Sequence, residues 1–338
     1  MPCLVNVLAY VALAGHARDV AVAAGCCTAS WLRDEQLRWA LVKARHRESR
    51  ETRLHWACSI GNAARVGELL DWRSDIEARC SGSFTPLHVA SISDHVDVVR
   101  ELLRRGADIE AKDKDGNSPL LLASQENATA VVRELLARGA DINVRNAEGL
   151  TPLIIAAYYG RTSVLQTLLQ REDIDVSVCG WDGLSALHFA SDFGHGEIVR
   201  LLLEREDVNV NLRDNSGKTA LFSASNVAVA RLLLAHAGCD VTLRDESGAT
   251  ALLNVSIYCN ARVVSELLTH EGVDVNARDN DGCSALHLAS LFRRTGAVRA
   301  LLARAEVDVN ALDNNNNSPL SQASTKAVRD LLLARGAL

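Results

Sequence analysis

The chain has 338 residues, of which 48% are hydrophobic and only 4% are aromatic. Its formal net charge of −6 at pH 7 argues against nucleic-acid binding, which normally needs a net basic face. The nine cysteines are odd in number and form no CxxC pair, so they indicate neither a disulfide framework nor a zinc module. They predict reduced thiols, in the cytoplasm or the nucleus.

The longest apolar run lies near the N-terminus, from Leu4 to Gly15. It is too short to span a bilayer, and the polar residues His16, Arg18 and Asp19 end it. No basic segment precedes the run, as a signal peptide would require. The sequence therefore predicts no membrane association.

Residues 1–45 carry apolar side chains at spacings of three and four, which predicts short helices. The segment resembles a degenerate F-box, a helical module that docks onto the Skp1 adaptor of cullin-type ubiquitin ligases. The resemblance rests on Pro2-x-Leu4, on Val7-Leu8-x-Tyr10-Val11-x-Leu13 and on Asp34-x-x-Leu37-x-Trp39. It implies that Skp1 is contacted by Pro2, Leu4, Val7, Leu8 and Leu13.

Two alternatives for residues 1–45 remain open. In the first, the segment is a plain helical cap. It covers the exposed face of the first repeat in the repeat array that follows it in the chain, as such arrays need. In the second, the segment is itself a degenerate copy of the repeat, because Gly15-His16 followed by Val20 is typical of the second helix of such a repeat. Gly15 lies 46 residues before its counterpart Gly61, however, which is out of register with the period of the array.

From residue 52 onward one short sequence motif recurs nine times, and successive copies start 31 to 34 residues apart. A fixed period of this length is the signature of a repeat architecture. The copies start at Thr52, Thr85, Ser118, Thr151, Ser185, Thr219, Thr250, Ser284 and Ser318.

Each copy predicts a pair of short helices. The opening Thr or Ser is suited to cap the first helix, and a Pro directly after it suits the first helical position. A second apolar helix comes next, for example over 98–103, and a glycine such as Gly106 or Gly139 ends it. A polar segment such as 113–116 then turns into the next copy. Neither helix is stable alone, so each copy must bury its apolar face against its neighbours.

These features resemble the ankyrin repeat over residues 46–338. The resemblance rests on the phrase Thr85-Pro-Leu-His88, on the ending Gly106-Ala-Asp108 and on turns such as Asp214 to Gly217. It implies an all-α solenoid of nine stacked helix-turn-helix units with projecting β-turns, whose concave side binds a protein partner. The copies that start at Thr219 and Ser318 are three residues short between their two helices.

The sequence offers no catalytic, cofactor or metal site. His55, His88, His188 and His287 occupy the same position of their own copies, and the resemblance implies that each bonds the Thr or Ser of its own turn. Gly217-Lys218-Thr219 imitates the end of a phosphate-binding loop, but Leu212 stands where that loop needs a glycine. We therefore expect a protein that is not an enzyme.

Seven of the fourteen aromatic residues fall at turn tips or on the outward part of first helices. The ankyrin resemblance places these positions on the concave face, where the fold does not dictate the side chain. Exposed aromatic side chains are typical of binding hot spots. The predicted partner-binding residues are Phe84, Ile92, Leu150, Tyr158, Tyr159, Trp181, Leu184, Phe193, Tyr258 and Phe292. Alternatively several of them, Phe193 and Phe292 in particular, turn inward and pack between repeats.

The sequence supports two hypotheses on function. In the first, residues 1–45 bind Skp1 and the array recruits a substrate to the ligase. In the second, the protein is a stand-alone scaffold or inhibitor, and residues 1–45 only cap the array. Both predict a protein partner on the concave face, and we expect the protein to be a monomer.

Overall fold

The computed structural model describes residues 52–258 and 261–338, and the helical segment predicted within 1–45 lies outside that range. The described residues form nine helix pairs and no β-strand, which confirms the predicted all-α repeat fold. None of their helices has the length and apolar character that a membrane crossing requires. The chain divides into a first unit that ends at Ala147 and a second unit, Glu148–Leu338.

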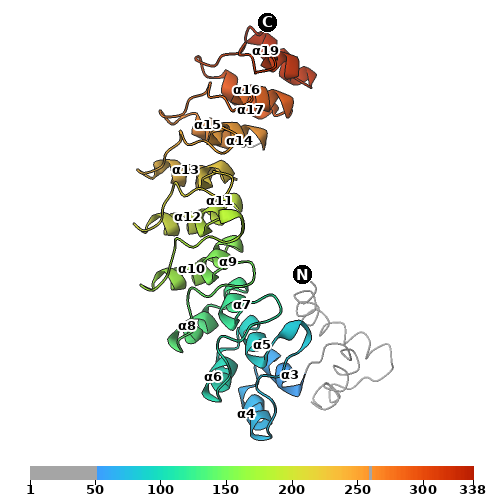
Figure 1. Ribbon diagram of the computed structural model, residues 1–338, viewed down its shortest axis with the longest axis vertical. Coiled ribbons are helices and arrows are strands. Elements are labelled where there is room, and N and C mark those ends of the chain that lie inside the picture. Colours follow the sequence, from blue (N-terminus) through green and yellow to red (C-terminus); the bar gives the residue numbers. More distant parts are fainter. Residues whose placement is uncertain (1–51, 259–260) are drawn as a thin grey trace, which may run out of the picture. The chain divides into compact units, whose positions relative to one another are not determined.

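The first unit contains three helix pairs (Figure 1). Its first helices pack on one another in chain order, and so do its second helices. The first helices are α3 (Arg53–Ser59), α5 (Pro86–Ile92) and α7 (Pro119–Gln125), and the second helices are α4 (Ala63–Asp71), α6 (Val96–Arg104) and α8 (Thr129–Ala137). A short 3-10 turn, η2 (Ser81–Ser83), precedes α5.

The second unit stacks six pairs in the same way, in chain order from α9 to α19 (Figure 1). Its first helices are α9 (Pro152–Tyr158), α11 (Ala186–Asp192), the 3-10 helix η4 (Ala220–Ser223), α14 (Ala251–Ile257), α16 (Ala285–Leu291) and α18 (Pro319–Gln322). Its second helices are α10 (Thr162–Leu169), α12 (Gly196–Leu203), α13 (Val227–Ala235), α15 (Ala261–Leu267), α17 (Thr295–Leu302) and α19 (Lys326–Ala334). The 3-10 turn η3 (Trp181–Gly183) precedes α11.

A reciprocal cap starts the first helix of four copies. In α5, Thr85 Oγ1 accepts a hydrogen bond from His88 N at 3.4 Å, and Thr85 N donates to His88 Nδ1 at 3.1 Å. His88 Nε2 then donates to the carbonyl oxygen of Asn117 in the next copy, at 3.1 Å. The same arrangement occurs at His55, His188 and His287. The predicted structural role of the four histidines is therefore confirmed, and it ties each copy to the next one in the chain.

The third copy provides a matched contrast. Leu121 stands where these four copies have histidine, and Ser118 Oγ is buried without a hydrogen-bond partner. We expect Thr85→Ala to lower the free energy of unfolding by about 1–2 kcal/mol, because it removes the cap. Ser118→Ala should change it far less, because it removes a buried, unsatisfied hydroxyl. Urea denaturation of both variants measures the difference, and equal losses would contradict this account of the cap.

Glycines end the second helices of several copies, and aspartates shape several of the turns that follow, as predicted for Gly106, Gly139 and segment 113–116. Gly106 and Gly139 both have φ +90°, a left-handed conformation that side-chain-bearing residues rarely adopt. In the next turn, Asp113 Oδ1 accepts hydrogen bonds from Asp115 N at 2.9 Å and Asn117 N at 2.8 Å. The segment 217–219 is such a turn as well, since Asp214 Oδ1 accepts from Lys218 N at 2.9 Å.

The two copies predicted to be short are short in their first helix. η4 and α18 have four residues each, whereas α11 and α16 have seven. The sixth copy therefore lacks the last helical turn, which in α11 carries Asp192. This shortening falls immediately after the fifth copy, which contributes to the site described below.

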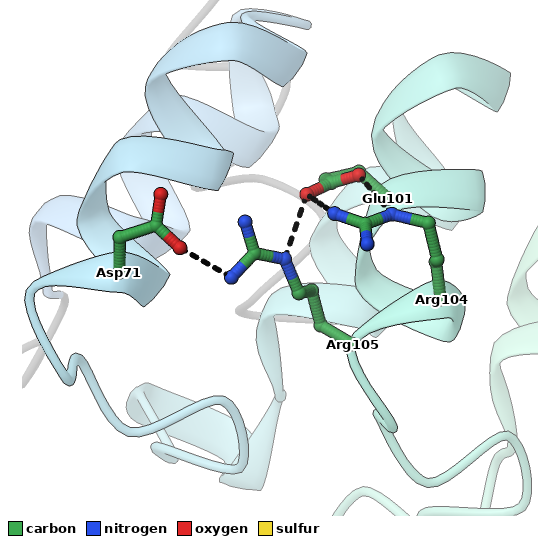
Figure 2. Close-up of polar contacts among 4 residues, drawn as sticks. All are labelled: Asp71, Glu101, Arg104 and Arg105. Carbon is green, nitrogen blue, oxygen red and sulfur yellow. Dashed lines mark hydrogen bonds and ion pairs between the residues drawn. The ribbon is translucent and has the colours of Figure 1, made fainter.

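Ion pairs connect the second helices of the first unit. Arg105 lies between Asp71 of α4 and Glu101 of α6, as Figure 2 shows, with N–O distances of 2.5 Å and 3.0 Å. Glu101 also accepts two hydrogen bonds from Arg104, which lower the pKa of its carboxyl. The network joins two copies at the face opposite their first helices.

Candidate functional site

Five aromatic side chains of the fourth and fifth copies form one group, which we call the aromatic cluster. Its members are Tyr158, Tyr159, Trp181, Phe189 and Phe193. The chain places them at three neighbouring points of the second unit: the end of α9, the start of η3, and α11 with the residue that ends it. Residues predicted separately from the sequence are thus brought into contact.

Tyr158 lies at the centre of the aromatic cluster. Its ring centroid is 4.7 Å from that of Phe193, 4.8 Å from Tyr159, 5.4 Å from Phe189 and 6.1 Å from Trp181. Most of these pairs are edge-to-face, a geometry that is worth about 0.5–1.5 kcal/mol a pair beyond the burial of apolar area. The rings therefore hold one another in place without a ligand.

The aromatic cluster is anchored on one side and open on the other. Phe189 is only 4% exposed and forms its base, and Tyr158 is half-buried. Tyr159, Trp181 and Phe193 are 39%, 37% and 48% exposed. Phe193 therefore does not turn inward, and neither does Phe292, which is also exposed. The inward orientation is therefore wrong for both residues, although the ring of Phe193 does contact Tyr158 of the preceding copy.

The sequence prediction missed Phe189. The available signal was its position four residues before Phe193 on the same helix, since side chains at i and i+4 share a helix face. In four of the other copies this position holds an aliphatic residue, such as Ile155 in α9. Phe189 supports the other rings of the site, since its ring centroid lies 5.4 Å from those of both Tyr158 and Trp181.

The prediction that Leu150 lies on the binding surface is wrong, because its side chain is only 7% exposed. Gly180 in the next copy explains this. A Cβ atom at position 180 would lie 2.6 Å from Leu150 Cδ2, so Leu150 occupies the space that a side chain would fill there. Most copies have an aspartate or asparagine at the position of Gly180.

The other predicted residues lie apart from the aromatic cluster. Leu184 is half-buried next to η3, and Tyr258 is exposed at the end of α14. Phe84 and Ile92 belong to the first unit and are half-buried, and Phe84 packs edge-on to His88 at 5.9 Å. The structure thus brings together four of the ten predicted residues: Tyr158, Tyr159, Trp181 and Phe193.

Two polar side chains contact the rings of the aromatic cluster, and two aspartates adjoin its residues in the chain. The guanidinium carbon of Arg161 lies 5.9 Å from the ring centroid of Tyr159, and the ring of His195 stacks on Phe193 at 6.3 Å. Asp182 follows Trp181 in η3, and Asp192 precedes Phe193 at the end of α11. Burial raises the pKa of the Asp192 carboxyl. Neither aspartate forms an ion pair with any residue that the structure describes.

The cysteines and the possible metal ligands among the described residues give little support for a reactive site. Burial raises the pKa of the Cys239 and Cys283 thiols to about 11, which keeps them protonated and poorly nucleophilic. Within residues 52–258 and 261–338, no group of three or more His, Cys, Asp or Glu side chains is arranged to hold a metal ion.

A cavity of about 420 Å³ lies beside α4 and α6 of the first unit. It is lined by Ala63, Ala64, Gly67, Asp97, Arg100, Glu101, Arg104 and Arg138. Its three arginines already pair with carboxylates: Arg104 with Glu101 at 2.7 Å, and Arg100 and Arg138 with Glu134 at 2.8 Å and 3.1 Å. Because these charges are neutralised, the cavity is a weaker candidate for a ligand site than the aromatic cluster.

Comparison with protein families identifies the repeat. The family described as Ankyrin repeats (3 copies) matches residues 20–113, 105–178, 171–245, 229–313 and 252–337. A search of the curated proteins finds no match to the chain. The family matches cover most of the sequence and agree with the helix pairs, the caps and the turns described above. The chain therefore belongs to the ankyrin-repeat family and is a protein–protein interaction module.

Proposed function

We propose that the protein binds a protein partner through the three exposed rings of the aromatic cluster, and that it is not an enzyme. The observation that carries the proposal is the contact of these rings over a buried base, Phe189. Large aromatic side chains supply much contact area at low entropic cost and dominate binding hot spots. Tyr258 and Phe292 would extend the contact toward later copies.

Preorganisation supports the same proposal. Binding costs free energy when interface side chains must be immobilised, about 0.5–1.5 kcal/mol for each flexible side chain. Tyr159, Trp181 and Phe193 each contact another ring of the aromatic cluster already, so less of this cost remains at the moment of binding. A partner therefore meets a surface whose shape is set by the fold.

Affinity capture with the full-length protein as bait tests the proposal. The proteins retained by the wild type are compared with those retained by a variant that lacks the three exposed rings. Partners lost selectively from the variant support the aromatic cluster as the site. If the two baits retain the same proteins, the proposal fails.

A second candidate function concerns residues 1–45, which lie outside the described residues. The F-box-like phrases support a substrate-recruiting adaptor of a cullin-type ubiquitin ligase, in which this segment binds Skp1 and the array of residues 46–338 holds the substrate. Such an adaptor would act by raising the substrate's effective concentration near the ligase. The first ankyrin match begins at residue 20, which favours the alternatives, a cap or a degenerate repeat in a stand-alone scaffold or inhibitor.

Skp1 binding separates these alternatives. If the segment is an F-box, Skp1 should co-purify with the full-length protein and be lost on deletion of residues 1–45. Leu8→Asp should have the same effect, because it puts a charge on the predicted apolar contact. Leu8→Met is the control, since it keeps the contact apolar. Failure of Skp1 to associate with the wild type would rule out the adaptor and leave the stand-alone binder.

We also propose that the protein acts as a monomer in the cytoplasm or the nucleus, without binding nucleic acid or membranes. The net charge of −6 supports the absence of nucleic-acid binding, and the odd number of cysteines without a CxxC pair supports a reducing compartment. Size-exclusion chromatography with light scattering tests the oligomeric state.

A further inference from the structure

We infer that the aromatic cluster takes a cationic peptide segment, whose arginine side chains lie on its rings and pair with Asp182 and with Asp192. This inference rests on the proposed function, because it specifies the partner of the same surface. It is carried by the positions of the two aspartates, by their lack of an ion-pair partner among the described residues, and by the exposed ring faces beside them.

Both aspartates are exposed, and each directly adjoins an exposed ring residue in the chain. Asp182 directly follows Trp181 at the tip of η3, and its backbone is fixed there because its carbonyl oxygen accepts a hydrogen bond from Asn215 N at 2.8 Å. Asp192 ends α11 as Tyr158 ends α9, seven residues after the start of its copy. Asp192 therefore occupies, one copy later, the position that Tyr158 has in α9.

Several other acidic residues in these two copies are already paired, and Glu172 and Glu206, which are unpaired among the described residues, adjoin no aromatic residue in the chain. Asp173 pairs with Arg171 at 2.9 Å, Asp207 with Arg205 at 2.7 Å, and Glu197 with Arg200 at 2.5 Å. Asp182 and Asp192 have no such partner among the described residues, and Asp192 borders apolar surroundings that raise the pKa of its carboxyl. A cationic side chain beside each aspartate would supply the interaction that its carboxylate lacks.

The cationic side chains near the aromatic cluster leave the rings of Trp181 and Phe193 uncovered. Arg161 lies over Tyr159, on the α9 side of the aromatic cluster. In the described part of the chain, no arginine or lysine lies over the ring of Trp181 or Phe193. These two rings flank the aspartates in sequence, so an incoming cation meets ring faces and carboxylates together.

Arginine suits this surface better than a neutral or acidic side chain. Its planar guanidinium stacks on aromatic rings and donates parallel hydrogen bonds to carboxylates. Two arginines of the described residues stack on rings within the chain: Arg161 lies 5.9 Å from the Tyr159 ring centroid, and Arg65 lies 5.1 Å from that of Trp72. An acidic peptide would instead be repelled by both aspartates.

Selection from a random dodecapeptide display library tests the inference, with the full-length wild-type protein as target. Peptides that also bind the Tyr159→Ala, Trp181→Ala, Phe193→Ala variant are removed. We expect the remaining sequences to be enriched in arginine. A synthetic peptide of the consensus should bind the Asp182→Asn, Asp192→Asn variant about tenfold more weakly or worse, as loss of a charge-assisted hydrogen bond predicts.

The matched control removes two carboxylates from the same copies at another place. Glu172 and Glu206 are exposed, follow the second helices α10 and α12, and form no ion pair with described residues. The Glu172→Gln, Glu206→Gln variant has the same net charge as the aspartate variant, so any loss of affinity common to both reflects only the overall charge.

The possible outcomes distinguish failure of the cationic partner from failure of the proposed function. A neutral or acidic consensus that still depends on the three rings overturns the cationic partner and leaves the proposed function intact. An arginine-rich consensus that binds both charge variants equally also overturns it. If no enriched peptide depends on the rings, the inference and the proposed function fail together.

Discussion

Replacing Tyr159, Trp181 and Phe193 together with alanine is expected to abolish partner capture while leaving the array folded. Their exposed surfaces contribute to binding rather than to the core, and a hot-spot side chain is worth about 2 kcal/mol or more. Three of them amount to a loss of at least about a thousandfold in affinity, even if their effects are only partly additive. Surface plasmon resonance with a captured partner measures the affinity, and circular dichroism measures the thermal unfolding.

Two further variants show whether the lost affinity belongs to these rings. Trp72→Ala removes an exposed indole from the first unit and should leave capture unchanged. Phe189→Ala removes the buried base of the aromatic cluster, so it should destabilise the fold by about 3–5 kcal/mol. Unchanged capture by the triple variant would contradict the site. A loss of stability in that variant comparable to Phe189→Ala would show that the exposed rings act mainly as core.

Tyr158 is left out of the triple variant for a structural reason. It contacts four other rings and is half-buried, so its removal would disturb the rings around it as well as the surface. Tyr158→Phe removes only the hydroxyl and keeps the ring contacts. It serves to ask whether the partner uses the hydroxyl as a hydrogen-bond group.

Acidification from pH 7 to pH 4 is expected to destabilise the array strongly, through its four capping histidines. Burial lowers the pKa of His55, His88, His188 and His287, and that of His88 falls to about 4. The unfolded chain takes up a proton on each near pH 6.5, whereas the folded chain resists this. Stability is therefore complete above about pH 6.5 and is lost as the pH falls toward the folded-state pKa.

The expected loss in free energy of unfolding is large because all four histidines contribute to it. A single histidine with its pKa at about 4 instead of 6.5 accounts for about 3 kcal/mol over this range. Protonation also removes the acceptor at Nδ1 that holds Thr85 N and thus breaks the cap. Urea denaturation at several pH values between 7 and 4 measures the loss.

His88→Gln is the matched variant for this prediction. Glutamine at the third helical position still closes a capping box, but it does not titrate. The variant should therefore lose less free energy of unfolding than the wild type between pH 7 and pH 4. An identical pH dependence in both proteins would show that His88 is not among the groups responsible. The aspartates whose pKa is lowered, such as Asp313, contribute in the same direction only below about pH 4.

The sequence alone was sufficient to predict the repeat and its local structure. The nine helix pairs, the caps at residues such as Thr85, the left-handed Gly106 and the two shortened copies all result from short-range patterns. These features depend on residues within one copy, where hydrogen bonds span three or four positions. The repeated sequence therefore specifies them copy by copy.

Only the tertiary structure decided which predicted surface residues meet and which are covered. Leu150 and Trp181 both sit at turn positions, but Leu150 is buried because Gly180, a copy later, leaves space for its side chain. Phe189 joins the aromatic cluster because α9 and α11 pack side by side, which places it 5.4 Å from Tyr158. Exposure at a repeat surface depends on the neighbouring copy, since side chains a full repeat apart in sequence compete for the same space. The period of the sequence does not encode that competition, whereas the packing of adjacent copies resolves it.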